Sequence, residues 1–129
     1  MKKILSIDDQ PMVLRCLSQA LGGRGYDMTV TDSPVEGLRI LRENNDIELL
    51  LLDVKMPGKS GFDVYRELHK FRKIPVLFVT AHQKSFAASS QTVAEMWRNE
   101  FSDGITDIIY KPFDLEVLFE KVENLIGGP

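Results

Sequence analysis

The sequence predicts a doubly wound α/β domain, in which a parallel sheet of five strands is covered by helices on both faces. Short aliphatic or β-branched runs recur along the chain, and each is followed by a stretch with helical spacing of apolar residues. The runs at 49–52 and 76–79 are wholly apolar, which is typical of parallel strands buried on both faces. Right-handed crossovers then distribute the helices over the two faces. The runs lie at residues 4–7, 28–31, 49–52, 76–79 and 107–110.

Capping residues predict where the helices begin. Pro11 stands at a favoured first position, and two glycines at 22 and 23 end that helix. Residues 33–36 form a Ser-Pro-Val-Glu capping box. A third helix follows Ser60, and a fifth is capped by Asp114. The apolar residues expected to face the core are Val13, Leu14, Leu17, Ala20 and Leu21, then Val35, Leu38 and Leu41, then Leu118, Val122 and Leu125 or Ile126.

One domain accounts for the whole chain. Its 129 residues suffice for a single compact core, and 43% of them are apolar. No repeat, low-complexity tract or interior linker interrupts the pattern. We expect the core to span residues 3–126, with Gly-Gly-Pro at 127–129 as a short tail.

Charge and cysteine content exclude several classes of protein. The 19 acidic and 16 basic residues give a net charge of -3, which argues against direct contact with nucleic acid. The basic cluster at 69–73 closes a predicted helix, where positive charge suits the dipole. Cys16 has no disulfide partner, and no zinc-ligand spacing occurs, so we expect a reducing compartment. No stretch approaches the ~20 apolar residues of a membrane span, so we expect a cytoplasmic protein without membrane contact.

Polar residues end four of the predicted strands. Asp8 and Asp9 follow the first strand, Asp53 the third, Thr80 the fourth and Lys111 the fifth. In a doubly wound sheet, ligands bind outside the carboxyl ends of the strands, where the winding direction reverses. Each residue alone is explained as a cap, turn or loop residue. Three carboxylates at one rim repel one another unless a cation neutralises them, so the complete set indicates a binding site.

The donor set favours a hard cation. A carboxylate-rich site without His or Cys suits Mg²⁺, which prefers a few carboxylates, water and a phosphate oxygen. A carboxylate beside Mg²⁺ and a lysine can attack phosphorus, because both cations offset the charge on the transferring group. Asp53 on the central strand is therefore the expected nucleophile, and Asp8 and Asp9 are expected to hold the metal.

These motifs resemble those of the receiver domain of two-component response regulators. The resemblance covers nearly the whole chain, from residue 3 to about residue 126. It implies a flavodoxin-like fold with strand order 2-1-3-4-5. The segments that carry it are Asp8-Asp9, Asp53-Val54-Lys55-Met56-Pro57 with Gly58 and Gly61, Thr80-Ala81, and Lys111-Pro112-Phe113.

The resemblance also implies roles for the acidic residues. Asp53 would accept phosphate from a histidine kinase or phosphotransfer protein. Mg²⁺ would be bound by Asp8, Asp9 and Asp53 together with the backbone carbonyl of Lys55. Such a module is not an enzyme, and only self-phosphorylation and self-dephosphorylation chemistry is expected of it.

The resemblance assigns the conformational response to phosphorylation to residues that end the fourth and fifth strands. Thr80 would supply the hydroxyl that moves onto the phosphoryl group, and Lys111 would pair with a phosphoryl oxygen, its bond to Pro112 being cis. Phosphorylation would then change the surface formed by the fourth helix, fifth strand and fifth helix. Ile108 departs from the family pattern, because relatives usually have an aromatic ring three residues before the lysine. Tyr110 lies on the opposite face from its strand neighbours and is not expected to replace that ring.

The segment before the fifth strand is longer than is usual in the family. The excess falls in residues 82–103, where apolar residues at helical spacing predict an extended amphipathic fourth helix. A longer loop before an ordinary helix is the alternative. Val93 and Met96 are expected in the core, whereas Trp97 and Phe101 suit either the core or a partner-binding patch.

Three other functions fit parts of this pattern. A flavodoxin needs a Ser/Thr/Gly-rich phosphate loop after the first strand, where this chain has acidic residues. An aspartyl-phosphate phosphatase of the haloacid dehalogenase type needs a general acid two residues after the nucleophile, where this chain has Lys55. A pseudo-receiver that only binds proteins is disfavoured by the complete set of acids, threonine and lysine, although Ile108 and the long fourth helix leave it open.

Overall fold

The sheet and the helices around it are described by a computed structural model that covers residues 1–81 and 105–129. The extended fourth helix predicted at 82–103, with Trp97 and Phe101, lies outside the described residues. The elements in chain order are β1 (Lys3–Ile7), α1 (Pro11–Gly23), β2 (Asp27–Thr31), α2 (Pro34–Glu43), β3 (Ile47–Leu52), α3 (Gly61–Leu68), β4 (Val76–Thr80), β5 (Thr106–Tyr110) and α6 (Leu115–Ile126).

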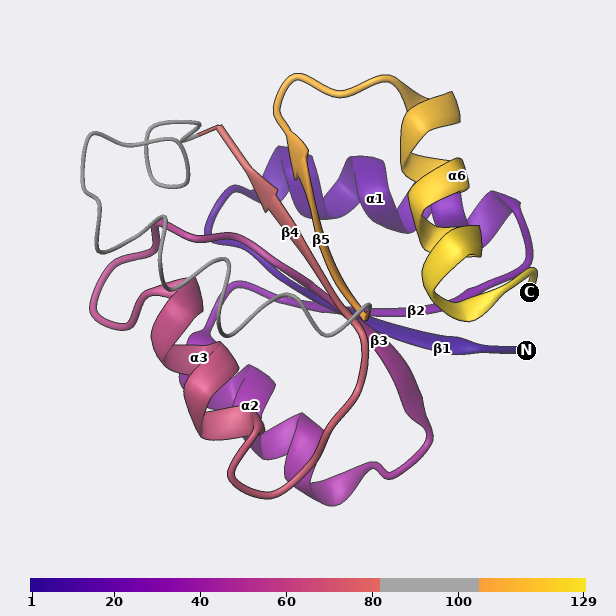
Figure 1. Cartoon of the computed structure of the whole chain (residues 1–129). Helices are drawn as coiled ribbons and strands as arrows, with labels where there is room; N and C mark the ends of the chain where they lie inside the picture. The colour runs from indigo at the N-terminus through magenta and orange to yellow at the C-terminus, as the bar shows by residue number, and fades with distance from the viewer. Residues whose placement is uncertain (82–104) are drawn as a thin grey trace.

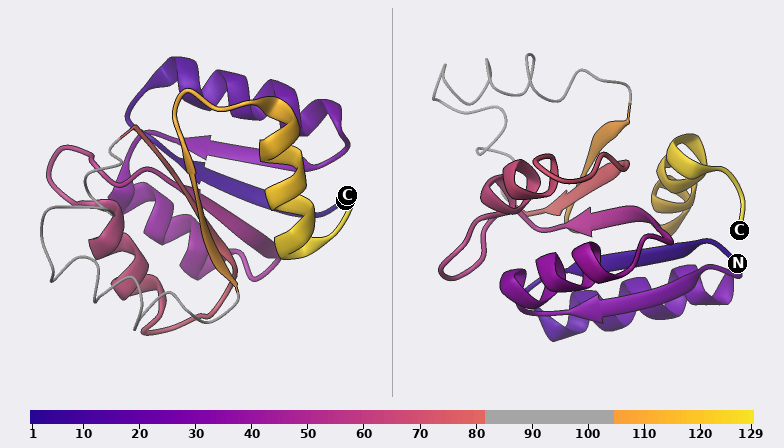
Figure 2. Two further views of the ribbon diagram at one scale, coloured as in Figure 1. Left: turned by 45° about the horizontal axis from the view of Figure 1, so that its top comes forward. Right: turned by 90° about the horizontal axis from the view of Figure 1, so that it is seen from below.

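The five strands form one parallel sheet in the order β2-β1-β3-β4-β5, which confirms the predicted topology. Helices α1 and α6 cover one face, and α2 and α3 cover the other (Figures 1 and 2). The chain crosses from β1 to the edge strand β2 and then returns to β3, so its winding reverses between β1 and β3. The carboxyl ends of these two strands therefore flank the expected ligand site.

Two apolar cores lie on the two faces of the sheet. One is built on α2 and α3 and contains Leu38, Leu41, Val64, Leu68 and Phe78. The other is built on α1 and α6 and contains Leu17, Leu21, Val79, Leu118 and Val122. Every residue of β4 is buried, as expected for a central parallel strand.

Most of the predicted inward-facing helix residues are buried, but the prediction for Val35 was wrong. Its side chain is 69% exposed, although Leu38 and Leu41 of the same helix are buried. Val35 lies in the first turn of α2 and lines a surface pocket together with Pro57 and Lys59. Helical spacing predicts which residues share a face, but not how deeply each residue of that face is buried.

The capping residues act as predicted in two helices and differ in a third. Ser33 Oγ accepts a hydrogen bond of 3.2 Å from Glu36 N, but the Glu36 carboxylate pairs with Arg39 instead of completing the predicted box. A complete capping box occurs at α3, where Ser60 and Asp63 bond to each other's backbone N–H. The carboxylate of Asp114 caps α6 by accepting from Glu116 N at 2.8 Å.

The predicted tail is anchored to the start of the sheet. The hydroxyl of Tyr26 donates to the Gly127 carbonyl at 2.9 Å, and the Lys2 ammonium donates to the Ile126 carbonyl. In the part of the chain that the structure describes, no helix is long and apolar enough to cross a membrane.

Candidate functional site

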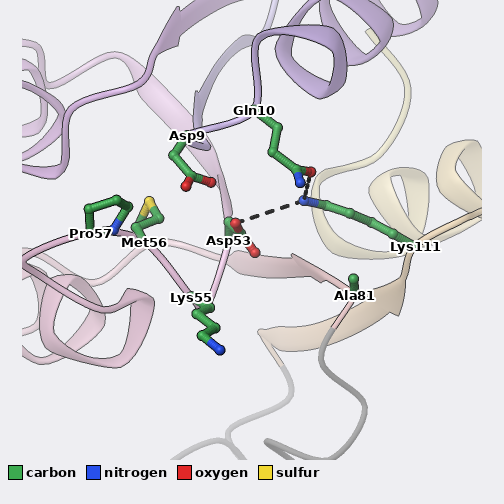
Figure 3. A pocket seen from close by; sticks show the side chains of 8 residues that line it. All are labelled: Asp9, Gln10, Asp53, Lys55, Met56, Pro57, Ala81 and Lys111. Carbon is green, nitrogen blue, oxygen red and sulfur yellow. Dashed lines mark hydrogen bonds and ion pairs between the residues drawn. The ribbon is translucent and has the colours of Figure 1, made fainter.

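The polar residues that end the strands meet at the carboxyl edge of the sheet. Backbone hydrogen bonds extend the strand pairing by one residue, with Asp53 N donating to Ile7 O at 3.0 Å and Lys111 N donating to Thr80 O at 2.8 Å. The side chains of neighbouring strand ends are thereby held at one rim, around a pocket of about 440 Å³ (Figure 3). The pocket is lined by Asp9, Gln10, Asp53, Lys55, Met56, Pro57, Ala81 and Lys111.

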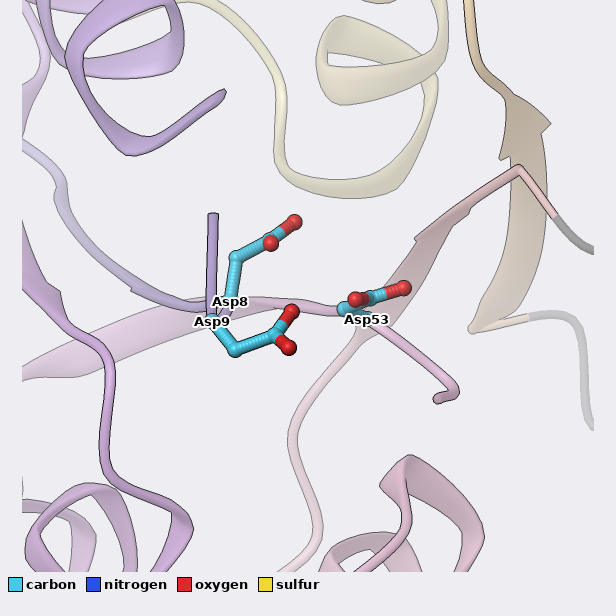
Figure 4. Close-up of side chains that lie close together, drawn as sticks. All are labelled: Asp8, Asp9 and Asp53. Carbon is cyan, nitrogen blue, oxygen red and sulfur yellow. The ribbon is translucent and has the colours of Figure 1, made fainter. Parts of the chain in front are cut away.

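Three carboxylates gather at this rim from two adjacent strands. Oxygen atoms of Asp8, Asp9 and Asp53 all lie within 4.8 Å of one another (Figure 4). Asp8 and Asp53 are 1% and 4% exposed, whereas Asp9 is exposed to solvent. Burying two carboxylates this close together costs free energy, so the arrangement favours the binding of a cation.

The ammonium of Lys111 partly neutralises the acidic group. Its Nζ lies 2.9 Å from Asp8 Oδ2 and 3.8 Å from Asp53 Oδ2, and the lysine side chain is only 12% exposed. A third partner is Gln10, whose Oε1 accepts from the same Nζ at 3.1 Å. The peptide bond between Lys111 and Pro112 is cis, as the resemblance implied.

Among the carboxyl groups of residues 1–81 and 105–129, Asp53 has the most strongly shifted pKa. Its pKa is raised from 3.8 to about 6, mainly by burial and also by the nearby charge of Asp8, while Lys111 acts in the opposite direction. Asp53 Oδ1 is buried and has no hydrogen-bond partner among the described residues. A buried, unpaired carboxylate oxygen beside two other carboxylates is suited to binding a cation or to acting as a nucleophile.

A glycine positions the loop that carries Asp53. A Cβ placed on Gly61 would lie 2.2 Å from the Asp53 carbonyl oxygen and 2.9 Å from Val54 Cα, so only glycine allows α3 to begin this close to the end of β3. Gly61 N also donates to Val54 O at 2.7 Å. The beginning of α3 is thus tied directly to Asp53 and Val54 at the end of β3.

The donors at this rim fit Mg²⁺ by their chemistry. The three carboxylates supply hard oxygen atoms, and the free Oδ1 of Asp53 is one of them. Lys55 lines the same pocket, and Figure 3 shows its side chain pointing away from Asp9 and Gln10.

Thr80, the predicted switch residue, lies on β4, and Ile108, at the position of the family's usual aromatic ring, lies on β5. Thr80 is fully buried at the end of β4 and is paired in register with Tyr110. Ile108 and Tyr110 pack against the core on the α2 and α3 face, whereas Ile109 belongs to the opposite core. Tyr110 therefore faces away from Ile109, as strand alternation predicted.

Gln10 is the site residue that the sequence analysis missed. It precedes α1, where a polar residue is ordinarily interpreted as a helix cap, but its side chain makes no capping hydrogen bond. Its position directly after the acidic pair was the only signal in the sequence.

Comparison with known sequences identifies the family. The sequence model of the response regulator receiver domain matches residues 4–123. The chain belongs to the response regulator receiver domain family. Receiver domains of this family are signalling modules of two-component systems rather than conventional enzymes, and the predicted family is thus confirmed.

Several relatives are similar over almost the whole receiver domain. The chain is 27% identical to the chemotaxis protein CheY1 of Helicobacter pylori, with 97% of each chain covered. It is 28% identical to protein PilH of Pseudomonas aeruginosa, covering 99% of this chain and 100% of PilH. Its identity to the transcriptional regulatory protein GlrR of Escherichia coli is 27% over 95% of this chain, which spans only 26% of GlrR.

Solved receiver domains share the fold. A receiver domain protein from Clostridium thermocellum has a TM-score of 0.81 and 30% identity, with 98% of this chain and 94% of that chain covered. The response regulator TrrA of Thermotoga maritima, solved in complex with Mg²⁺-BeF, has a TM-score of 0.80 and 29% identity, with coverage of 98% and 100%.

Proposed function

We propose that this receiver domain is the phosphoacceptor module of a two-component phosphorelay and that Asp53 accepts the phosphoryl group in a Mg²⁺-dependent reaction. One observation carries the proposal: the buried Asp53 carboxylate has an unpaired oxygen, lies near Lys111, and is clustered with Asp8 and Asp9. The Mg²⁺-BeF complex of the related regulator TrrA supports the choice of metal.

The residues at the rim divide the chemistry between them. Asp8, Asp9, Asp53 and the Lys55 carbonyl would hold the metal, which when bound offsets negative charge on the phosphoryl oxygens. Lys111 stabilises the same charge from the β5 side of the pocket. With a pKa of about 6, Asp53 is mostly ionised at neutral pH and so is able to attack.

The donor in this proposal is a phosphohistidine on a histidine kinase or phosphotransfer protein. An oxygen of Asp53 forms a bond to phosphorus as the bond between phosphorus and the histidine nitrogen breaks. The electron pair of the broken bond stays on the imidazole nitrogen, which takes up a proton from solvent. The product is an aspartyl phosphate on this chain and a neutral histidine on the donor.

The output in this proposal runs through β4, β5 and α6. The Thr80 hydroxyl moves onto the new phosphoryl oxygens and selects one of two conformations of the surface formed by the fourth helix, β5 and α6. Lys121 of α6 pairs with Asp107 of β5 at 3.1 Å, which joins these two elements. Because Ile108 replaces the usual aromatic residue, this switch works without an aromatic relay. The proposed location of this signalling step is the cytoplasm.

Labelling with a small phosphodonor tests the proposal. Purified protein incubated with radiolabelled acetyl phosphate and Mg²⁺ is expected to take up one acid-stable, base-labile label, and a chelator is expected to prevent it. Asp53→Asn should abolish the label, whereas Asp32→Asn should retain it, because Asp32 is an exposed residue outside the pocket. Persistent labelling of Asp53→Asn would show that the acceptor is another residue.

A further inference from the structure

We infer that Gln10 is a positioning residue for Lys111, whose ammonium it holds in the acceptor pocket when Asp8 turns to the metal. This inference rests on the proposed function of Asp53 and adds a residue to that site. It begins from the side-chain oxygen of Gln10, which lies 3.1 Å from Lys111 Nζ (Figure 3).

The side chain of Gln10 is directed at Lys111 rather than at its own helix. Gln10 occupies the N-cap position of α1, yet its side chain makes no capping hydrogen bond. The backbone N–H of Gln10 donates to Asp8 Oδ1 at 2.9 Å, which fixes Gln10 beside the acidic pair. Lys111 reaches the same point from the end of β5, so the contact joins the first and the last strand in the chain.

Asp8 has two roles that conflict. In this structure its Oδ2 binds the Lys111 ammonium at 2.9 Å, but the same carboxylate belongs to the acidic cluster that would hold the metal. A carboxylate shared with a divalent cation attracts the ammonium less, and the two cations repel each other. Among the described residues, the Lys111 ammonium donates hydrogen bonds to two side chains, and the one besides Asp8 is Gln10.

A neutral amide is better suited than another carboxylate to holding the Lys111 ammonium in this pocket. The Gln10 oxygen accepts a hydrogen bond from the lysine without adding negative charge that would repel an incoming phosphoryl group. Without Gln10, the lysine side chain has space to leave, because a second pocket of about 450 Å³ adjoins the first. Gln10 and Lys111 line both pockets, so their hydrogen bond lies where the two pockets meet.

Substitutions at position 10 separate this role from metal binding. Gln10→Met has a similar volume but offers no strong acceptor, Gln10→Glu retains an acceptor, and Gln19→Met changes an exposed residue of α1 as the matched control. Three measurements apply to each protein: the Mg²⁺ Kd by calorimetry, the rate of phosphorylation by acetyl phosphate at saturating Mg²⁺, and the NMR signal of the Lys111 ammonium in the Mg²⁺-loaded protein.

Gln10→Met is expected to slow phosphorylation by about threefold to tenfold, the effect of losing one hydrogen bond to a charged group at a partly exposed site. Its Mg²⁺ Kd should change by less than twofold. Its Lys111 ammonium signal should broaden through faster exchange with water, whereas the signal in Gln10→Glu and Gln19→Met should persist. These results together would support a positioning role.

Two outcomes would overturn the inference. One is a Gln10→Met protein with the same rate and the same lysine signal as Gln19→Met. The other is a slower rate of Gln10→Met at saturating Mg²⁺ together with a Lys111 ammonium signal that persists as it does in Gln19→Met, because Gln10 would then not act through the lysine. Failure of the proposed function would be distinguishable, because in that case the wild-type protein itself would take up no label at Asp53.

Discussion

The Lys111 ammonium lies between two carboxylates, 2.9 Å from Asp8 Oδ2 and 3.8 Å from Asp53 Oδ2. These acids follow adjacent strands, and the lysine follows the edge strand two positions away from β3. The ammonium therefore neutralises part of the acidic cluster in the absence of metal. The neutralisation is incomplete, because burial and Asp8 still hold the pKa of Asp53 at about 6.

Lys111→Met is predicted to tighten Mg²⁺ binding while impairing phosphorylation. The substitution removes a positive charge that competes with the metal for the carboxylates, so the Mg²⁺ Kd should fall by about fivefold, or ~1 kcal/mol. The rate of phosphorylation by acetyl phosphate should fall by at least ~10-fold, because the transferring group loses a neutralising partner. Calorimetry and labelling measure the two effects separately. Weaker Mg²⁺ binding would show that the ammonium does not compete with the metal.

The raised pKa of Asp53 predicts that the stability of the metal-free protein falls as the pH rises from about 4 to about 6. Its pKa is raised in the folded state from 3.8 to about 6, so its contribution favours folding below pH 4 and is lost as the pH rises through 6. Asp53→Asn lacks this titration and should be more stable than wild type at pH 7, by on the order of 2 kcal/mol.

The measurement for this prediction is the free energy of urea unfolding at pH 4 and pH 7 in the presence of a chelator. The difference between Asp53→Asn and wild type should largely disappear at pH 4. Glu48→Gln is the control, because Glu48 is an exposed carboxylate of β3 outside the cluster. A pH-independent difference for Asp53→Asn would contradict the raised pKa.

Asp8→Ala and Asp9→Ala are each predicted to weaken Mg²⁺ binding. Each variant removes one of three carboxylates whose oxygen atoms lie within 4.8 Å of one another, so the Kd should rise by at least ~10-fold. Glu48→Ala should leave the Kd unchanged. An unaltered affinity in both aspartate variants would mean that these residues serve only the start of α1.

Gly61→Ala is predicted to destabilise the domain and to disturb the acceptor. The new methyl group would meet the Asp53 carbonyl oxygen at 2.2 Å, and backbone atoms there have little freedom to move. The expected loss is about 1–3 kcal/mol in the free energy of unfolding. Gly22→Ala is the matched control, because a Cβ at Gly22 meets nothing within 4 Å. Equal stability of the two variants would rule out a close packing role for Gly61.

Arg72→Ala is predicted to loosen the connection between α2 and β3. The guanidinium of Arg72 donates to the carbonyls of Asn44 and Asn45 at 2.6 Å each, and also to those of Leu41 and Ile47. The loss should be ~2 kcal/mol by thermal or urea unfolding, with Lys73→Ala near wild type. Comparable losses in the two variants would point to a general effect of charge.

Arg72 also shows where local interpretation of the sequence was incomplete. The basic segment at 69–73 was interpreted through the dipole of the helix before it, yet Arg72 contacts carbonyls at the end of a different helix, α2. The same limitation applies to Gln10, whose partner Lys111 is 101 residues away in the sequence. Contacts between distant segments leave no periodic signal in the chain.

The positions of the strands and the residues that end them follow from local patterns, because buried parallel strands require apolar runs and the carboxyl ends of those runs share one rim. For this reason the sequence predicts Asp8, Asp53 and Lys111 at one rim, and the structure brings them together. The order of the strands was implied only by the resemblance to the receiver family, and the structure confirms it.

The balance of charge within that rim depends on tertiary packing. Which carboxylate pairs with Lys111, which oxygen of Asp53 lacks a partner, and which way Gln10 turns are decided by distances of a few ångströms between separate strands. Electrostatic energies and pKa values change steeply over such distances and with burial, whereas sequence spacing constrains neither.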